Sequence, residues 1–263
     1  MSYLNTLSAK QRDNAAIVVD RAKKGGITSP FSLAAILSVI SKESGFMPQN
    51  EVTYANTPNA RIRAIFGSRV ANLSEAQLES LKKNDAAFYE QVYGMQWNHI
   101  LGLGNTQKGD GYKYRGRGFN GITGRYLYDK YGKLTGHNLI DNPDKLNEIP
   151  VAADVAVAYF KNQFASPNNR LSAYSSTGIN DFSNVKDSTL AFYHANAGWG
   201  KTPQQIMADT TGGLKRALDR APEFYVWEGI TKGSSKKKMI VAVGAFVALA
   251  VSGYLLYKNL KTN

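Results

Sequence analysis

An uncharged stretch of 19 residues, MIVAVGAFVALAVSGYLLY at 239–257, constrains the fold of this chain more than any other feature. A helix of this length crosses a hydrocarbon core about 30 Å thick. The stretch is apolar on all sides, ends in Tyr254 and Tyr257 and has lysines on both flanks, which fits a bilayer better than a protein core. We therefore predict a transmembrane helix at 239–257, a basic flexible linker at 231–238 and a short basic tail at 258–263.

The lysines around this stretch predict its orientation. Lys232 and the run 236–238 precede it, whereas only Lys258 and Lys261 follow it. The flank richer in lysine stays in the cytoplasm, so we expect residues 1–230 on the cytoplasmic side of a single-pass membrane protein. The N-terminal sequence MSYLNTLSAKQRDNAAIVV lacks the basic-then-apolar order of a secretory signal, and we expect it to be retained.

Charge indicates the kind of partner. The chain has 32 Lys and Arg against 20 Asp and Glu, a formal charge of +12. Five of the lysines and no acids lie from residue 236 onward, so the preceding part carries 27 minus 20, or +7. A charge of this sign favours nucleic acid, an anionic lipid surface or a bacterial cell wall as partner, and charge alone does not choose among them.

Cysteine and histidine limit the chemistry. The sequence contains no cysteine, which excludes disulfides and thiolate catalysis. Its three histidines, at positions 99, 137 and 194, are far apart and show no HExxH or comparable ligand spacing. We therefore predict neither a metal site nor a cofactor.

The region before the linker predicts a mainly α domain, because apolar residues recur there at helical spacing. Ser8 and Gln11 have the spacing of a capping box, and Pro30 and Gly45 mark the ends of a second helix. Between residues 94 and 124 the chain is rich in Gly, Asn and aromatic residues without a helical period, which is typical of a binding surface. Helices are predicted at 8–24, 30–44, 74–83, 85–93, 150–163, 187–195 and 203–219.

Glu43 is the first candidate for acid–base chemistry. Leu33, Ile36, Leu37 and Ile40 follow the i, i+3, i+4, i+7 rule, and Glu43 continues their stripe by three residues. A carboxyl on an apolar face is desolvated, which raises its pKa and keeps a proton available for a general acid. The alternative is that the helix end lies at the surface and the carboxyl contacts water.

A second carboxyl, Glu51, follows eight residues later at the head of the loop EVTYANTPNA. Two carboxyls separated by a turn can face each other across a cleft, and about 6.5 to 9.5 Å between them leaves space for a water. One carboxyl then protonates the leaving oxygen while the other activates that water. Spacing alone is a weak signal, because 20 acids form many such pairs.

The segment GDGYKYRGRGFNGITGRY, at 109–126, combines aromatic, Arg and Asn side chains with closely spaced glycines. Aromatic faces stack on sugar rings, Arg and Asn contact hydroxyl and acetamido groups, and glycines let a ligand approach the backbone. A phosphate loop is disfavoured because GxxxxGK[ST] is absent. An RNA-binding Arg/Gly segment is disfavoured because such segments are repetitive, so no specific nucleic acid partner is predicted.

These motifs, taken in order, resemble glycoside hydrolase family 19, which contains chitinases and phage endolysins. The resemblance spans roughly residues 8 to 225. It implies a lysozyme-like, two-lobed helical domain with a central cleft, within residues 1–230. The matching segments are SKESGF at 41–46, Glu51, IRAIFG at 62–67, GDGYKYRGRG with ITGRYLY, DNPD at 141–144, VAADVAVAYF, INDFSNV and YHANAGWG.

The resemblance also implies roles for individual residues. Glu43 would be the general acid and Glu51 the general base of an inverting hydrolysis, and Thr123 would help to hold the attacking water. Without the resemblance, Thr123 would be interpreted as a helix cap. The implied sugar-binding residues are Tyr112, Tyr114, Arg117, Asn120 and Asn196, the last of which is otherwise typical of a turn.

The sequence departs from the family pattern at three positions near these residues. Gly121 stands where a glutamine that contacts substrate is usual, and Asn120 replaces an apolar residue. Lys42 replaces the frequent histidine before the acid, and the disulfides of plant members are absent. The last two differences favour the lysin branch over plant-type chitinases.

The leading hypothesis is therefore a muramidase that degrades peptidoglycan glycan strands and is anchored in a lipid bilayer through residues 239–257. The alternatives are a chitinase and a non-catalytic, membrane-anchored glycan-binding or structural virion protein. A domain on the cytoplasmic side cannot reach the wall. Two locations would bring the domain to the wall. The first is the internal membrane of a phage virion, where other membrane or capsid proteins would be partners. The second is the host inner membrane, with lysis after a holin-like lesion exposes the enzyme to the wall.

Overall fold

In a computed structural model, the chain is described at residues 2–165, 174, 178–197, 201–209, 211–227 and 230, and there it is mainly helical. This confirms the predicted mainly α fold. Within the described residues no strand forms, and extended pairing is limited to an isolated bridge between Arg117 and Ile122. The predicted linker, membrane helix and tail, 231–263, lie outside the described residues. Among the helices that are described, none is long and apolar enough to cross a bilayer.

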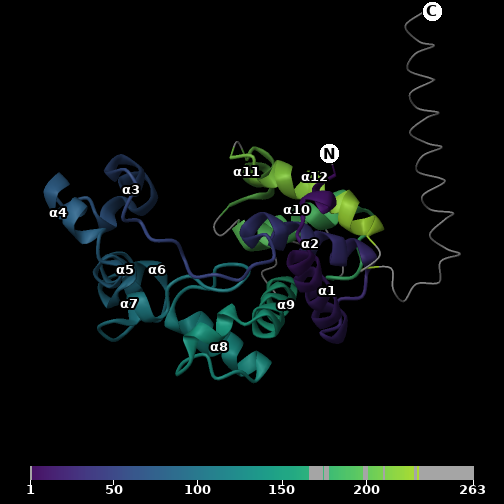
Figure 1. The fold of residues 1–263 in the computed structure, drawn as a ribbon, viewed down its shortest axis with the longest axis horizontal. Helices are drawn as coiled ribbons and strands as arrows, with labels where there is room; N and C mark the ends of the chain where they lie inside the picture. Colours follow the sequence, from purple (N-terminus) through teal and green to yellow (C-terminus); the bar gives the residue numbers. More distant parts are fainter. Residues whose placement is uncertain are drawn as a thin grey trace, which may run out of the picture.

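The helices fall into two groups in Figure 1. One contains α1, α2 and α9 to α12, the other α3 to α7, and α8 lies below them in that view. The α-helices are α1 Ala9–Lys24, α2 Pro30–Ser44, α3 Asn59–Phe66, α4 Glu75–Leu81, α5 Asp85–Tyr93, α6 Asn98–Leu101, α7 Asp110–Lys113, α8 Arg125–Thr135, α9 Ile149–Ala165, α10 Val185–Ala197, α11 Pro203–Met207 and α12 Gly213–Val226. Short 3-10 helices are η1 Tyr3–Thr6, η2 Gly67–Arg69, η3 Met95–Trp97 and η4 Pro143–Asn147.

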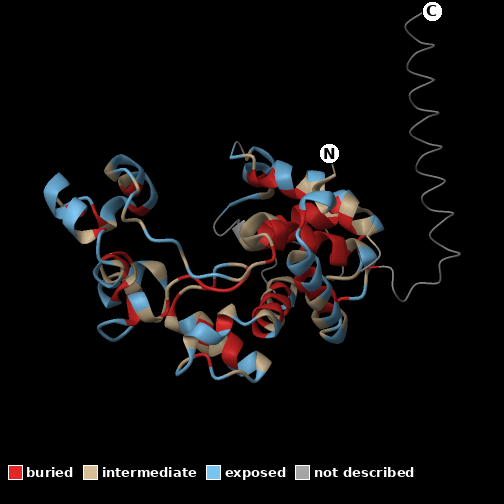
Figure 2. Cartoon of the chain, in the orientation of Figure 1, coloured by how far each residue is buried: buried red, intermediate tan, exposed pale blue. Residues whose placement is uncertain are grey.

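Helix α2 is the centre of the larger group. It packs chiefly against α10 and α12, and every residue from Ser32 to Ser41 is buried (Figure 2). The predicted apolar stripe is therefore part of a helix that is covered on all sides over most of its length. Burial ends before Glu43, which is half-buried near the last turn of the helix.

Local signals predicted the helix ends well. Capping boxes form at Ser8 with Gln11 and at Ser74 with Gln77. Pro30 occupies the first turn of α2, and Gly45 ends it with a left-handed φ of 57°, a conformation that glycine adopts without a steric cost. These ends depend on residues three or four positions apart, so sequence suffices to locate them.

The predicted helix at 203–219 is wrong in its continuity, because the structure divides it into α11 and α12. The side chain of Asp209 accepts hydrogen bonds from the backbone amides of Thr211 and Leu214, and Gly212 adopts a left-handed φ of 73°. An Asp that binds the amides ahead of it favours a turn over a continuing helix. The hydrogen bond from the Thr211 hydroxyl, together with these backbone bonds, lowers the pKa of the Asp209 carboxyl.

The smaller group of helices has its own core, built largely from aromatic rings. Tyr54, Phe66, Phe88, Tyr89 and Tyr93 pack with ring centroids 5.1 to 6.2 Å apart. Such edge-to-face and offset contacts stabilise a small core beyond the area that they bury. This cluster also carries two tyrosine hydroxyls to the candidate site described below.

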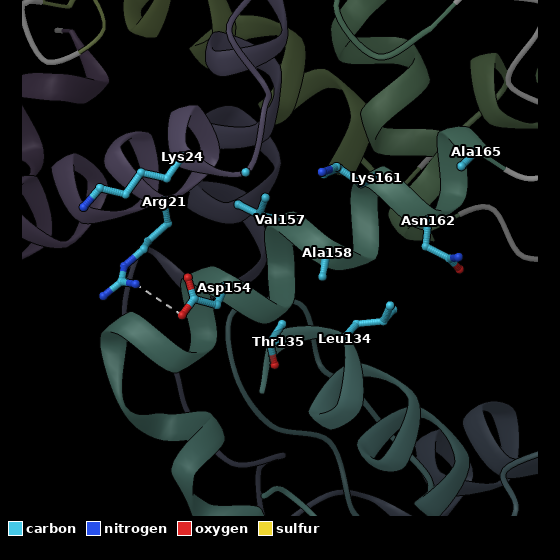
Figure 3. A pocket seen from close by; sticks show the side chains of 11 residues that line it. Arg21, Lys24, Leu134, Thr135, Asp154, Val157, Ala158, Lys161, Asn162 and Ala165 are labelled. Atoms are coloured by element: carbon cyan, nitrogen blue, oxygen red, sulfur yellow. Dashed lines mark hydrogen bonds and ion pairs between the residues drawn. The ribbon is translucent and has the colours of Figure 1, made fainter. Parts of the chain in front are cut away.

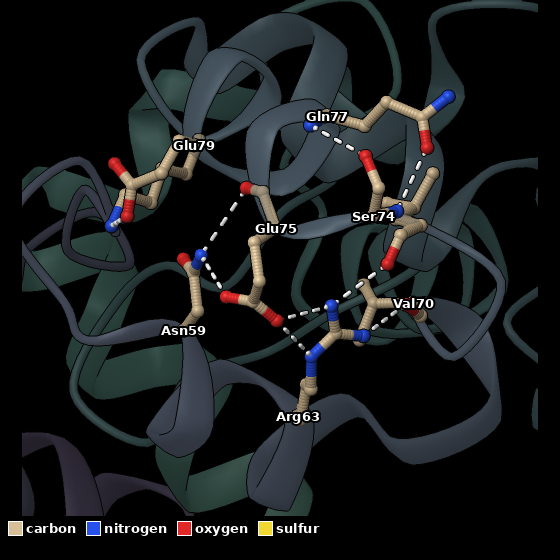
Figure 4. A network of polar contacts seen from close by, with 9 residues as sticks. Asn59, Arg63, Val70, Ser74, Glu75, Gln77 and Glu79 are labelled. Carbon is tan, nitrogen blue, oxygen red and sulfur yellow. Dashed lines mark hydrogen bonds and ion pairs between the residues drawn. The ribbon is translucent and has the colours of Figure 1, made fainter.

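Arg63 ties this small core to the turn that follows α3 (Figure 4). Its guanidinium donates to the carbonyl oxygens of Val70 and Leu73 at 3.0 and 2.7 Å, and also to Glu75. The Glu75 side chain is 71% exposed, so its ion pair contributes little to stability, whereas the part-buried carbonyls need a donor.

We expect Arg63→Ala to lower the free energy of unfolding by about 1–3 kcal/mol, because two carbonyls lose their charged donor. Thermal unfolding followed by circular dichroism measures the change. Arg61→Ala, at an exposed position on the same helix, is the matched control and should leave the unfolding midpoint unchanged. Equal midpoints for the two variants would contradict this role of Arg63.

Candidate active site

The chain leaves α2 by a sharp turn that aims the following loop across the molecule. After Gly45, Phe46 also has a left-handed φ, 62°, although its side chain is fully buried. A bulky residue is strained there, so the surroundings must hold it. The Asn14 amide donates to the Phe46 carbonyl at 2.8 Å, and the ring packs edge-on against Phe224. This turn fixes the direction in which the loop that carries Glu51 leaves α2.

Backbone pairing brings this loop to the segment rich in glycine. The Glu51 amide donates to the Gly116 carbonyl at 2.7 Å, and the Gln49 amide donates to the Gly118 carbonyl at 3.4 Å. Arg117 and Ile122 exchange both of their backbone hydrogen bonds, which closes a tight loop over residues 118–121. The sequence motif therefore lies directly beside Glu51.

A cavity of about 300 Å³ opens where these segments meet. It brings together four of the predicted site residues, which are Glu43, Glu51, Asn120 and Thr123. The volume is large enough for a sugar unit and its substituents. The remaining lining residues are Ser44, Gln49, Asn50, Val52, Tyr93, Gly116, Gly118, Phe119 and Gly121.

Glu51 is held at both carboxyl oxygens. Oε1 accepts hydrogen bonds from the hydroxyls of Tyr93 at 3.0 Å and Tyr54 at 3.3 Å, and Oε2 accepts from the Gly116 amide at 3.2 Å. Burial raises the pKa of the Glu51 carboxyl, and these hydrogen bonds and the nearby Arg115 oppose that rise only in part. The same burial raises the pKa of Tyr54 to about 12.

Glu43 has a different environment from the one its place on the stripe predicted. Its Oε1 accepts from the Lys42 ammonium and from the Asn196 amide, both at 2.9 Å, and its side chain is 24% exposed. The sequence predicted the drier setting for Glu43, but its side chain is partly exposed in the structure, and it is the pKa of Glu51 that burial raises. The reason is that the aromatic core of the smaller helix group covers Glu51, while Glu43 lies beyond the buried part of α2.

Thr123 and Glu51 flank Gly116. A Cβ on Gly116 would lie 3.1 Å from Glu51 Oε2 and 3.3 Å from Thr123 Oγ1, so the glycine leaves the space between these two polar atoms open. Thr123 Oγ1 donates to the Gly121 carbonyl at 2.9 Å. A water between the carboxylate and the hydroxyl would have an acceptor on one side and a hydroxyl on the other.

We expect Gly116→Ala to lower the rate of glycan cleavage by roughly 10- to 100-fold with little loss of stability, because a methyl group displaces reacting atoms by fractions of an ångström to about 1 Å. The backbone conformation of Gly116 is not left-handed, so alanine adds no backbone strain, and its methyl group would push on the Glu51 and Thr123 side chains. The measurement compares cleavage rate and unfolding midpoint. An unchanged rate would show that the space beside Gly116 is not used.

The side-chain amide of Asn120 is unusual at this site. Both its oxygen and its nitrogen are buried and make no hydrogen bond to any described residue. An unpaired buried amide costs about 1–3 kcal/mol, which a hydrogen-bonding ligand can offset. Gly121, its neighbour, has a left-handed φ of 65°, a conformation that explains glycine where a glutamine would be strained.

Tyr114 and Arg117, predicted as sugar contacts, are not among the cavity-lining residues. Tyr114 is fully buried and its hydroxyl donates to the Ile140 carbonyl. Arg117 is 3% exposed and donates to Asp144 and to the Tyr128 hydroxyl. Both side chains are buried and occupied by these contacts, and their contact with sugar stays a prediction.

Tyr112 and Asn196 also lie outside the cavity lining, in two different ways. Tyr112 is 37% exposed, and the Arg115 guanidinium covers its ring at 4.2 Å from the centroid. Asn196 donates to Glu43 and so orients the predicted acid. In the structure Asn196 is a hydrogen-bond donor to the Glu43 carboxyl, and its contact with sugar stays a prediction.

Three residues near Glu51 were not predicted as site residues. Tyr54 lies within the loop that was singled out, three positions after Glu51, and Arg115 lies within the 109–126 segment. Tyr93 is 42 positions from Glu51 along the chain, and no local pattern connects the two. Only the packing of α5 against this loop reveals its contact.

Comparison with known proteins supports the resemblance over part of the chain. A glycosyl hydrolase family 19 domain-containing protein from Haemophilus influenzae is 39% identical over 61 residues. The match covers 23% of this chain and 30% of that protein, so this chain spans less than a third of its relative's length. No protein-family model matches the chain.

A larger cavity, about 510 Å³, lies between α1, the end of α8 and α9 (Figure 3). Its charged lining consists of Arg21, Lys24, Asp154 and Lys161, and Arg21 is already paired with Asp154. One carboxylate with a cationic partner cannot supply both an acid and a base. The smaller cavity, with two carboxyls, is therefore the candidate active site. Over the described part of the chain, no group of three His, Asp or Glu side chains is placed to bind a metal ion.

Proposed function

We propose that this chain is a glycoside hydrolase that cleaves the β-1,4 bonds between N-acetylated sugars in peptidoglycan. The observation that carries the proposal is that Glu43 and Glu51 line one sugar-sized cavity. The partial similarity to a glycosyl hydrolase family 19 domain-containing protein supports the same class of reaction. The two helix groups on either side agree with the lysozyme-like, two-lobed domain that the resemblance implies.

In the proposed inverting reaction, Glu43 gives its proton to the leaving glycosidic oxygen as the bond to the anomeric carbon breaks. Water attacks that carbon from the opposite face and gives its proton to ionised Glu51. One water is consumed, two sugar hydroxyls appear, and the two carboxyls exchange their protonation states through solvent. The free space beside Gly116 is the proposed place of the water, with Thr123 as its second partner.

Asn120 is the proposed contact for the acetamido group of the substrate. Its unpaired oxygen and nitrogen match the N–H and carbonyl of an acetamido substituent, and pairing them would remove the cost of leaving them buried. A sugar without the acetamido group would leave the amide unpaired. This complementarity favours N-acetylated glycans over unsubstituted ones.

Mass spectrometry of products tests the proposal. The full chain would be incubated with purified peptidoglycan, chitin and deacetylated chitin, and released fragments would be identified. Fragments with a reducing N-acetylmuramic acid end support the muramidase, and chitin oligomers alone would support the chitinase. Binding to either glycan by pull-down without release of fragments would favour the alternative of a non-catalytic glycan-binding or structural protein.

We further propose that residues 239–257 anchor the chain in a membrane, either inside a phage virion or in the host inner membrane. The length and lysine flanks of that stretch support this location. In a virion, neighbouring membrane or capsid proteins would be partners. Extraction of purified particles with detergent and with high salt tests the idea. Particles that lack the chain would rule out the virion location, and release of the chain by salt alone would rule out a membrane anchor.

A further inference from the structure

The contact between Lys42 and Glu43 is unusual for neighbouring residues in a helix. Consecutive side chains point about 100° apart, and residues at i and i+1 do not face each other. Nevertheless the Lys42 ammonium lies 2.9 Å from Glu43 Oε1, and the two side chains are only 17% and 24% exposed. Something outside α2 must therefore turn the lysine toward the carboxyl.

Contacts with Tyr193 of α10 and with the start of α12 orient the Lys42 side chain. The Lys42 ammonium lies over the Tyr193 ring, 5.5 Å from its centroid. The Tyr193 hydroxyl is fixed by a 2.9 Å hydrogen bond to Asp209. A Cβ on Gly213 would lie 3.1 Å from Lys42 Cε and 2.5 Å from Tyr193 Oη, so glycine at this position leaves room for both side chains. The lysine is thus held between α10 and the start of α12, both of which are distant from it in sequence.

The two donors on Glu43 share one oxygen. Lys42 and Asn196 both donate to Oε1, and no described residue donates to Oε2. A protonated carboxyl has one carbonyl-type oxygen, which accepts two hydrogen bonds, and one hydroxyl oxygen, which donates. Because Oε1 already accepts two bonds, the proton of Glu43 belongs on Oε2.

We propose that Lys42 is a positioning residue that reserves Glu43 Oε1 as an acceptor, directs the acid proton to Oε2 and stabilises the carboxylate left after proton transfer. This inference rests on the proposed function, because it assumes that Glu43 is the general acid. The bond that breaks is O–H at Oε2 and the bond that forms is O–H at the leaving oxygen. The negative charge that remains on Glu43 then has an ammonium 2.9 Å away.

Other charged groups around Glu43 do not replace Lys42. The Tyr193 hydroxyl donates to Asp209, and Glu51 lines the same cavity as Glu43, but none of these groups supplies a positive charge. Arg220 of α12 donates to Ser41, two residues before Glu43, and stacks over Tyr3. Lys42 is the cation that contacts the Glu43 carboxyl within the described part of the chain.

The test compares two substrates of the full chain. One is peptidoglycan, followed by release of reducing ends, and the other is an aryl glycoside of an N-acetylated sugar, whose leaving oxygen needs little protonation. In Lys42→Met the rate on peptidoglycan should fall by about 10²- to 10³-fold, the usual cost of losing a donor to a developing charge. The rate on the aryl glycoside should fall much less, because Glu43 need not give up its proton there, and Lys42→Arg, which keeps the charge, should keep most of the rate on peptidoglycan.

Lys215→Met is the matched control, because it removes one exposed lysine of α12 that pairs only with Asp219. It should leave the rates on both substrates unchanged. An equal loss of rate on peptidoglycan and on the aryl glycoside in Lys42→Met would overturn the inference. Should that variant fail to fold by circular dichroism, Lys42→Gln carries the same expectation. A wild-type chain that releases no reducing ends from any N-acetylated glycan would instead overturn the proposed function.

Discussion

Glu43→Gln is expected to lower the rate of glycan cleavage by about 10²- to 10⁴-fold, the usual contribution of a positioned general acid. Glutamine keeps the size of the side chain and can still accept the bonds from Lys42 and Asn196. What it lacks is a proton that it can give to the leaving oxygen. The rate is measured on purified peptidoglycan by zymogram and by release of reducing ends.

A substrate with a good leaving group sharpens this prediction. An aryl glycoside of an N-acetylated sugar needs little protonation of its leaving oxygen, so Glu43→Gln should affect its cleavage much less than that of the polymer. Glu148→Gln, an exposed Glu outside the cavity, is the matched control and should cleave at the wild-type rate. Full clearing of cell walls by Glu43→Gln would refute the assignment of the acid.

Glu51→Gln is the second large effect, again with an expected loss of about 10²- to 10⁴-fold, because an amide cannot accept a proton from the attacking water. The wild-type rate should fall as the pH drops through the pKa of Glu51, since the base must be ionised. Burial raises that pKa, so the acid limb lies at higher pH than for an ordinary carboxyl. Glu51→Gln should leave no such limb in its residual rate.

The same variant is expected to be more stable than wild type near neutral pH. In the window above the ordinary carboxyl pKa, 4.5, the unfolded chain releases the proton of Glu51 while the folded chain retains it. Stability therefore falls as the pH rises through this window, and the penalty stays in full above the folded pKa. Glutamine has no such penalty, so its gain in unfolding midpoint should grow from pH 4 to pH 7.

Unfolding measured at both pH values separates this effect from packing. A gain of Glu51→Gln over wild type that is the same at pH 4 and pH 7 would show that burial of the charge is not its cause. Glu148→Gln should show no pH-dependent gain, because its side chain is exposed. Lower activity together with higher stability is the pattern expected of a group that is buried for catalysis.

The helices could be predicted from sequence because their signals are local. Ser8 and Gln11 cap the start of α1, Pro30 lies in the first turn of α2, and Gly45 ends α2, so each of these signals acts within one turn of the chain. The order of short motifs also indicated which two carboxyls belong together. The division of the helix at 203–219 escaped prediction, since a side chain at Asp209 competes with the backbone for the same amides.

The environments of the two carboxyls depend on contacts between distant parts of the chain. Glu51 is half-buried beneath Tyr93, 42 positions away, whose hydroxyl donates to its carboxyl, and Lys42 turns toward Glu43 because Tyr193 lies beside it. Tyr114 and Arg117 look like sugar contacts in a linear motif and are in fact buried. Desolvation depends on every atom that surrounds a group, whatever its position in sequence.

From its residue order alone, then, this chain determined where most of the predicted helices begin and end, because capping rests on neighbours a few positions apart. The same order, through the resemblance of its motifs, indicated which two carboxyls are candidates for acid–base chemistry. Tertiary structure decided that burial raises the pKa of Glu51, which oxygen of Glu43 is already paired and which polar side chains reach the cavity. Those properties follow from packing between segments that the chain brings together only by folding.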